Sequence, residues 1–153
     1  MKIRNDFITN SSSTQFLVSF EKGQNFDSYM KQYFLREMKK ISIKSPKDYV
    51  DWIFNSIFIE DYNSSLEKEI KYHGDDKILQ FLYSFEDKTF AKIYLINEFT
   101  NCDFLDIDAY KEIISNNSKD VYSINVDNEF SFDFESTIVK NNGNIIRRID
   151  LWK

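Results

Sequence analysis

The stretch VYSINVDNEFSFDFESTIVKNNGNIIRRIDLW, residues 121–152, decides the fold class expected from this sequence. Three of its runs are rich in the β-branched and aromatic residues typical of strands, namely 121–126, 129–139 and 144–152. In the middle run Phe130, Phe132 and Phe134 alternate with polar residues, which predicts one apolar and one polar face. The turn-like NNGN at 141–144 then predicts a hairpin. The C-terminal part is therefore expected to form a β meander.

Upstream, the spacing of apolar residues predicts two further strands and several helices. The strands are expected at 16–20 and 90–99, where apolar and aromatic residues run together. Spacings of three and four residues predict the helices, at 26–40, 46–58, 66–71, 76–85 and 106–114. We expect one α+β domain over 1–153: a mostly antiparallel sheet with several helices packed on one face. No internal repeat or linker divides the chain.

Two of the predicted helices have recognisable start signals. Ser45 can cap the first of them, with Pro46 at the first helical position and Asp48 in the first turn. Asp75, in the turn His73–Asp76, is expected to cap the other. The face of that second helix should carry four apolar residues, Ile78, Leu79, Leu82 and Phe85.

Composition excludes several classes of protein. A hydrophobic fraction of 42% and an aromatic fraction of 17% over 153 residues argue against intrinsic disorder. No apolar run approaches the roughly 20 residues of a membrane span, and the start lacks the apolar stretch of a secretory signal, so we expect a cytoplasmic protein. A single cysteine excludes an internal disulfide and a Cys-rich zinc site. Ile, Asn, Lys, Phe and Tyr fill 73 positions, which indicates an AT-rich genome.

The charge pattern points to a basic partner rather than to nucleic acid. Residues 1–48 carry +4, residues 49–137 carry −12 and residues 138–153 carry +3, so the middle of the chain would repel phosphate. On the predicted strand 129–139, carboxylates at alternate positions would lie roughly 6.6–7 Å apart, a spacing on the scale of nucleic-acid phosphates. We therefore expect a partner-binding surface at Glu129, Asp133 and Glu135. Its partner would be a basic protein that handles nucleic acid.

The opening residues 4–16, RNDFITNSSSTQF, fit the pattern R-x-x-F-I-T-N-S-S-S-T-x-F. This segment resembles the opening of small proteins from low-GC Gram-positive bacteria and their phages, whose sequences diverge after it. The resemblance implies an origin and no activity. From the residues themselves, 1–14 is a polar, Ser-rich segment. Its hydroxyls can receive a modification or contact an anion, or simply form a polar turn, and the residues concerned are Asn10, Ser11, Ser12 and Ser13.

The side chains of common catalytic sites are sparse. His73 is the one histidine and has carboxylates beside it, but no nucleophile motif accompanies it. Four acidic residues, Asp103, Asp106, Asp108 and Glu112, can in principle bind a hard cation, yet their spacing fits no known calcium loop. Three glycines build neither a P-loop nor a dinucleotide fingerprint. We expect no catalytic residues, metal or cofactor.

These observations favour a non-catalytic protein that acts through protein–protein contacts. Its concrete form would be an accessory or inhibitor protein of a phage or mobile element that uses an acidic surface, with nucleic-acid mimicry as one mode. Two alternatives stay open. One is a small-ligand-binding protein or hydrolase-like enzyme around His73, which predicts carboxylates converging on that ring. The other is a homo-oligomeric structural protein in which surplus aromatic residues form the interface.

Overall fold

The computed structural model describes residues 13–23, 33, 35–59, 65–100, 108–115 and 119–151. The chain divides into two compact units. One, the sheet unit, comprises Met1–Ser42 and Lys111–Lys153; the other, the helical unit, is Ile43–Tyr110. Strands and helices both contribute substantially, and the strands form a mostly antiparallel sheet, so the predicted α+β class is confirmed.

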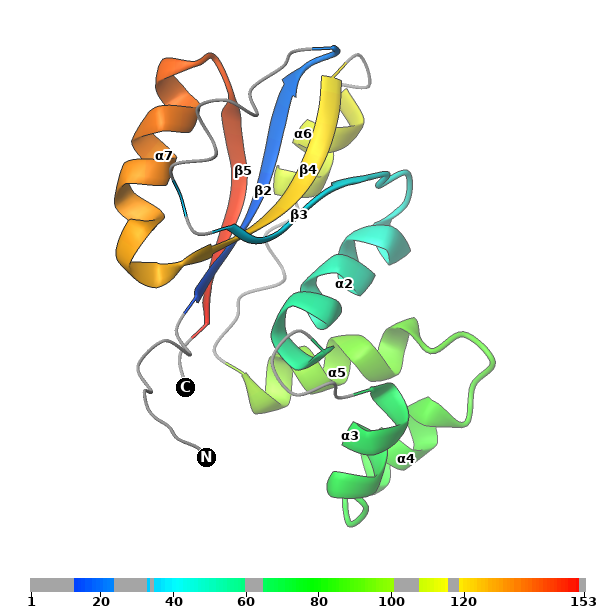
Figure 1. Cartoon of the computed structure of the whole chain (residues 1–153). Coiled ribbons are helices and arrows are strands. Elements are labelled where there is room, and N and C mark those ends of the chain that lie inside the picture. Colours follow the sequence, from blue (N-terminus) through cyan, green and yellow to red (C-terminus); the bar gives the residue numbers. More distant parts are fainter. Residues whose placement is uncertain are drawn as a thin grey trace. The chain divides into compact units, whose positions relative to one another are not determined.

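The sheet unit is built on four antiparallel strands in the order β3-β4-β2-β5. Their bounds are β2 Ser13–Glu21, β3 Leu35–Ile41, β4 Lys119–Asp127 and β5 Asn144–Leu151. The strands predicted at 16–20, 121–126 and 144–152 are confirmed in β2, β4 and β5, respectively. Strand β2 lies between β4 and β5 (Figure 1). In the register of these strands, Phe16 stands opposite Ile124 of β4 and Arg148 of β5.

A helix covers one face of this sheet and completes its core. Helix α7 (Ser131–Lys140) lies along the sheet in Figure 1 and places Phe134 and Ile138 against it. The ring centroids of Phe134 and Phe16 are 5.0 Å apart, and both side chains are fully buried. Around them gather the remaining buried members of the cluster, namely Val18, Phe20, Tyr33, Ile124 and Val126.

Helix α7 corrects the prediction of a strand at 129–139 and, with it, the β meander. A short 3-10 turn, η2 (Asn128–Phe130), leads into the helix. The sequence contains two apolar periods at once: Phe130, Phe132 and Phe134 repeat every second residue, whereas Phe130, Phe134 and Ile138 repeat every fourth. Both periods place Phe134 and Ile138 on one face, but only the helix turns Phe132 away from them, and Phe132 is exposed while the other two are buried against the sheet.

The predicted hairpin at 141–144 is also wrong, because this turn joins a helix to a strand. Asn142 adopts the left-handed conformation (φ 62°) after the last turn of α7. The N–H of Gly143 donates to the carbonyl of Ile138 (2.9 Å) and that of Asn142 to Val139 (3.2 Å), which is the Schellman pattern of helix ends. β5 then pairs with β2, not with the preceding segment.

The helix predicted at 26–40 is contradicted where the structure describes it. Residues Leu35–Ile41 form β3, which pairs along β4 with a register shift between Leu35 and Glu37. Apart from Tyr33, the earlier part of the predicted helix lies outside the described residues. Leu35 and Met38 are three residues apart, as on a helix face, and the register shift between them lets both pack against the same core from a strand.

The helical unit contains α2 (Pro46–Phe54), η1 (Asn55–Ile59, a π-helix continuing α2), α3 (Leu66–Tyr72), α4 (Lys77–Tyr83) and α5 (Thr89–Phe99). Helix α6 (Asp108–Ser115) begins in this unit and ends in the sheet unit. The start of α2 is confirmed: the Ser45 hydroxyl accepts from the N–H of Asp48 at 3.3 Å, and the Asp48 carboxylate accepts from the N–H of Lys44 at 2.9 Å. The predicted helices at 66–71, 76–85 and 106–114 are confirmed within a few residues.

The strand predicted at 90–99 is instead helix α5. Its fully buried residues, Ala91, Leu95 and Ile96, follow a helical spacing that the mixed apolar run FAKIYLINEF hides. A short continuous apolar run does not distinguish a strand from a buried helix by periodicity alone. Helix α5 packs on α2 and α4, and these contacts select the helical state.

Candidate functional site

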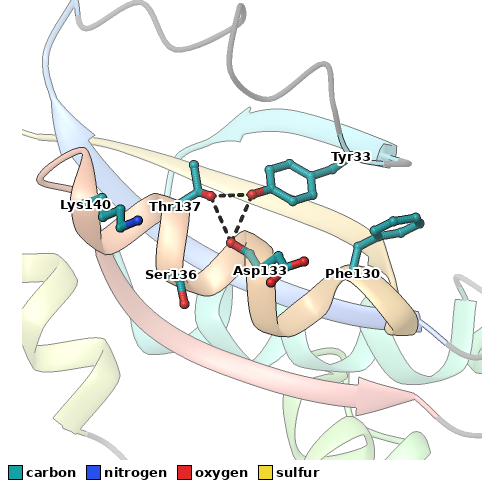
Figure 2. Close-up of a pocket in the computed structure, with 6 residues that line it drawn as sticks. All are labelled: Tyr33, Phe130, Asp133, Ser136, Thr137 and Lys140. Carbon is teal, nitrogen blue, oxygen red and sulfur yellow. Dashed lines mark hydrogen bonds between the residues drawn. The ribbon is translucent and has the colours of Figure 1, made fainter.

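A shallow hollow of about 360 Å³ lies along α7 in the sheet unit. Figure 2 shows Phe130 at one end, Lys140 at the other, and Tyr33 across the middle. We call this feature the α7 hollow; its lining residues are Tyr33, Phe130, Asp133, Ser136, Thr137 and Lys140. All except Tyr33 come from α7 or the turn before it, because one exposed helical stripe repeats every three or four residues.

Hydrogen bonds fix the floor of the α7 hollow. The Tyr33 hydroxyl donates to the backbone carbonyl of Asp133 at 3.0 Å and is also hydrogen-bonded to the hydroxyl of Thr137. The Thr137 hydroxyl lies 2.9 Å from the same carbonyl (Figure 2). The Tyr33 ring stands edge-on to Phe134, with 5.4 Å between ring centroids. Core packing and hydrogen bonding therefore hold Tyr33 in one orientation.

The structure separates the three predicted partner-binding carboxylates. Because 131–140 is a helix, the alternating ladder does not form, and Asp133 and Glu135 project from different sides of α7. Asp133 is exposed and lines the α7 hollow. Glu135 accepts from Arg148 at 2.7 Å, and Glu129 is exposed on η2. The hypothesis that these carboxylates imitate regularly spaced phosphates loses its geometric basis.

Only Ser13 of the predicted N-terminal motif can be placed. Asn10, Ser11 and Ser12 lie outside the described residues. Ser13 begins β2, opposite Asp127, and is fully buried. Its hydroxyl is therefore inaccessible to a modifying enzyme. Strand β2 begins at Ser13, so the last two residues of the polar segment expected over 1–14 belong to the sheet.

His73 packs as an aromatic residue in the helical unit. Its ring stacks on Phe99 with centroids 3.9 Å apart, and its Nε2 lies 3.6 Å from a carboxylate oxygen of Glu69. Its backbone N–H caps α3 by donating to the carbonyl of Glu69. Tyr72 covers the ring edge-on. Of the two aspartates that follow it in sequence, Asp75 is exposed, and Asp76 accepts hydrogen bonds from Leu79 and Tyr94.

Asp76, not the predicted Asp75, caps α4. One of its carboxylate oxygens accepts from the N–H of Leu79 at 3.0 Å, and the other accepts from the Tyr94 hydroxyl at 2.8 Å. These two hydrogen bonds lower the pKa of the Asp76 carboxyl, because they favour its charged form. The same contact raises the pKa of the Tyr94 hydroxyl. Asp76 thereby joins α4 to α5.

Acid should weaken this cap. A carboxyl whose folded pKa is lowered contributes stability above its unfolded pKa, about 3.9, and that contribution is lost as the pH falls through the folded pKa. We expect Asp76→Asn, which keeps a capping oxygen without a charge, to lose less stability than wild type between about pH 6 and pH 3. Urea denaturation at the two pH values measures this difference.

The variant Tyr94→Phe provides the comparison, because it removes one of the two hydrogen bonds and leaves the helix cap intact. Its loss of stability with acid should lie between those of wild type and Asp76→Asn. A loss in Asp76→Asn equal to that of wild type would contradict this assignment.

Three exposed apolar side chains of the helical unit lie on and just after α4. Of the four residues predicted to form the buried face of this helix, only Leu79 is fully buried. Ile78 and Phe81 on α4 are 59% and 63% exposed, and Phe85 just after it is 41% exposed. The rings of Phe81 and Phe85 contact each other edge-on at 5.1 Å. We call Ile78, Phe81 and Phe85 the Phe81 stripe.

Sequence reasoning missed the Phe81 stripe as a surface. The apolar residues of 78–85 occupy an arc too wide for one buried face, and this width indicates that part of the apolar surface stays exposed. Burial of Leu79 against neighbouring helices leaves the other side of that arc exposed.

In the described parts of the chain, no group of three or more histidine, cysteine or acidic side chains is arranged to hold a metal ion. Of the four acidic residues considered for a cation, Asp103 and Asp106 lie outside those parts, and Glu112 is hydrogen-bonded to Asn144. Within the same ranges, no helix has the length and apolar character needed to cross a membrane.

Comparison with known proteins adds no assignment. No protein-family model, no curated protein and no solved structure matches this chain.

Proposed function

We propose that this protein is a non-catalytic interaction module whose helical unit binds a basic segment of a partner protein through the Phe81 stripe. The observation that carries the proposal is the exposure of Ile78, Phe81 and Phe85, which lie on and just after a short helix. Large apolar side chains grouped in this way are costly to expose to water. Aromatic side chains are also frequent anchors of protein interfaces.

Spacing supports a helical or extended ligand lying across this surface. Ile78, Phe81 and Phe85 are three and four residues apart, so they form one stripe along α4 and its end. The rings of Phe81 and Phe85 are already held against each other, so a ligand would remove less side-chain entropy on binding. An apolar face of a partner helix fits such a stripe.

Charge identifies the chemistry of the partner. The helical unit carries seven lysines and fourteen carboxylates, a net charge of −7. Asp75 and Glu86 flank the Phe81 stripe, and both are exposed without an ion pair among the described residues. The ammonium of Lys88 is hydrogen-bonded to the carbonyls of Tyr83 and Phe85, so it is occupied. The complementary ligand is basic, with apolar side chains between its charges.

The same charge disfavours a second copy as the occupant. Self-association through the Phe81 stripe would bring two units of −7 together. Repulsion between the two units makes such a contact electrostatically unfavourable, whereas contact with a basic partner is electrostatically favourable.

Binding of a defined peptide tests the proposal. The probe is a fluorescein-labelled amphipathic helix with leucine and tryptophan on one face and lysine on the other, followed by fluorescence anisotropy. We expect Phe81→Ser with Phe85→Ser to raise the dissociation constant at least ~10-fold, because both anchors are lost. Phe132→Ser is the matched control: its ring is also exposed, but lies in the sheet unit.

A second peptide isolates the contribution of charge. Replacing each lysine of the probe with glutamate should weaken binding at least ~10-fold, and raising NaCl from about 0.05 to 0.5 M should weaken the lysine peptide. Equal binding of both peptides, or equal binding by wild type and the double variant, would refute the proposal. A concentration-dependent dimer that the double variant abolishes would assign the stripe to a second copy and would also refute it.

The setting we propose is the cytoplasm of a low-GC Gram-positive bacterium, with the gene on a phage or mobile element. It rests on the resemblance of residues 4–16 and on the AT-rich composition. A basic host protein that handles nucleic acid remains the partner class that fits this setting. The acidic surface that we propose to bind this partner belongs to the helical unit and not to residues 129–135.

A further inference from the structure

We propose that the α7 hollow binds a small zwitterion of di- or tripeptide length, with its ammonium against Asp133 and its carboxylate against Lys140. This site lies in the sheet unit and is independent of the Phe81 stripe. The two charged residues occupy the same side of α7, two turns apart.

The charges at both ends of the α7 hollow are available. Asp133 and Lys140 are exposed, and neither forms an ion pair among the described residues. Glu135, the other carboxylate of α7, lies outside the hollow and is neutralised by Arg148 at 2.7 Å. The hollow therefore presents one unpaired charge of each sign.

The separation of these charges sets the length of the ligand. Seven residues of α-helix advance about 10.5 Å, which is the axial distance from Asp133 to Lys140. Their side chains can lean toward each other and shorten the span. An extended peptide advances about 3.3–3.6 Å per residue, so two or three residues place a terminal ammonium and a terminal carboxylate at the two ends.

The middle of the α7 hollow is suited to a peptide backbone. The hydroxyls of Tyr33 and Thr137 contact each other, and both contact the carbonyl of Asp133. Each hydroxyl oxygen has lone pairs that these contacts do not all use, so it can accept from a ligand N–H. Ser136 supplies another hydroxyl from the lining of the hollow. The ring of Phe130 offers an apolar wall for a ligand side chain (Figure 2). A volume of about 360 Å³ is at the small end of ligand sites.

Chemical-shift titration of the full chain tests this site. The probe is the tripeptide Ala-Phe-Ala with free termini, added to ¹⁵N-labelled protein. We expect saturable shifts of the amides of residues 133–140. Acetylating the amino terminus or amidating the carboxyl terminus should each raise the dissociation constant about 2- to 5-fold, because each removes one solvent-exposed charge pairing.

Variants assign the two ends separately. Asp133→Asn should abolish the preference for a free amino terminus, and Lys140→Gln the preference for a free carboxylate. Glu135→Gln is the matched control, because it removes a carboxylate of the same helix that faces away from the hollow. Exchanging the two charges, Asp133→Lys with Lys140→Asp, should restore binding of the free tripeptide in the reverse orientation.

Three results would overturn this inference: shifts that do not saturate, shifts outside the α7 hollow, or equal binding of free and blocked peptides. None of them bears on the Phe81 stripe, because that surface lies in the other unit. Failure here and failure of the proposed function are therefore distinguishable.

Discussion

Phe134→Ala should lower the free energy of unfolding by about 3–5 kcal/mol, because it leaves a cavity in a core that cannot collapse around it. Phe134 is fully buried, and its ring contacts those of Phe16 and Tyr33. Loss of the ring removes its contacts with the core that joins α7 to the sheet. Urea denaturation followed by far-UV circular dichroism measures the change.

The matched control is Phe132→Ala, which makes the same chemical change two residues earlier. Phe132 is 76% exposed, so its truncation should change the free energy of unfolding by less than about 0.5 kcal/mol. In a strand the two rings would share a face and behave alike, whereas in a helix they lie about 200° apart. Equal losses for both variants would contradict the helix at 131–140.

Gly143→Ala should lower the free energy of unfolding by about 1–3 kcal/mol through overpacking. A Cβ atom at this position would lie 2.6 Å from Cε1 of Phe20 and 2.7 Å from Cγ2 of Ile138. Both side chains are buried in the core, at 1% and 0% exposure, so neither can move aside freely. Thermal and urea denaturation of the purified variant test this expectation.

The control for Gly143→Ala is the neighbouring Asn142→Gly. Asn142 has φ 62°, a conformation that glycine adopts at no steric cost, so this variant should keep or slightly increase stability. The two residues of the turn thus have different requirements: space at Gly143 and backbone conformation at Asn142. A stable Gly143→Ala protein would show that the helix end shifts to accept the methyl group.

Local signals predicted several elements well. The Ser45–Asp48 cap of α2, the apolar core of β2 and the strands β4 and β5 are each fixed by residues adjacent in sequence. Capping depends on a side chain and the next few N–H groups, so the sequence contains the whole interaction. The cap of α4 lies one residue later than predicted, at Asp76, whose other carboxylate oxygen accepts from the Tyr94 hydroxyl of α5.

The candidate sites were predicted less well. The acidic character of the middle of the chain carries over to the helical unit, which has a net charge of −7. The predicted surface at Glu129, Asp133 and Glu135 does not hold, because its regular spacing required a strand and residues 131–140 form a helix. The sequence predicted neither the Phe81 stripe nor the α7 hollow. The Phe81 stripe depends on which side of α4 the neighbouring helices cover. The α7 hollow depends on the contact of Tyr33 with a helix about a hundred residues later in the chain.

By itself, the sequence determined the α+β class, the caps and the strands whose residues favour one state locally. The tertiary structure decided 131–140 and 90–99, where the sequence is compatible with both a strand and a helix. In both segments buried contacts made the choice: α7 covers the apolar face of the sheet, and α5 packs between helices. Local preferences there differ by little, whereas burying a large apolar side chain contributes about 1.5–3 kcal/mol, so the packing prevails.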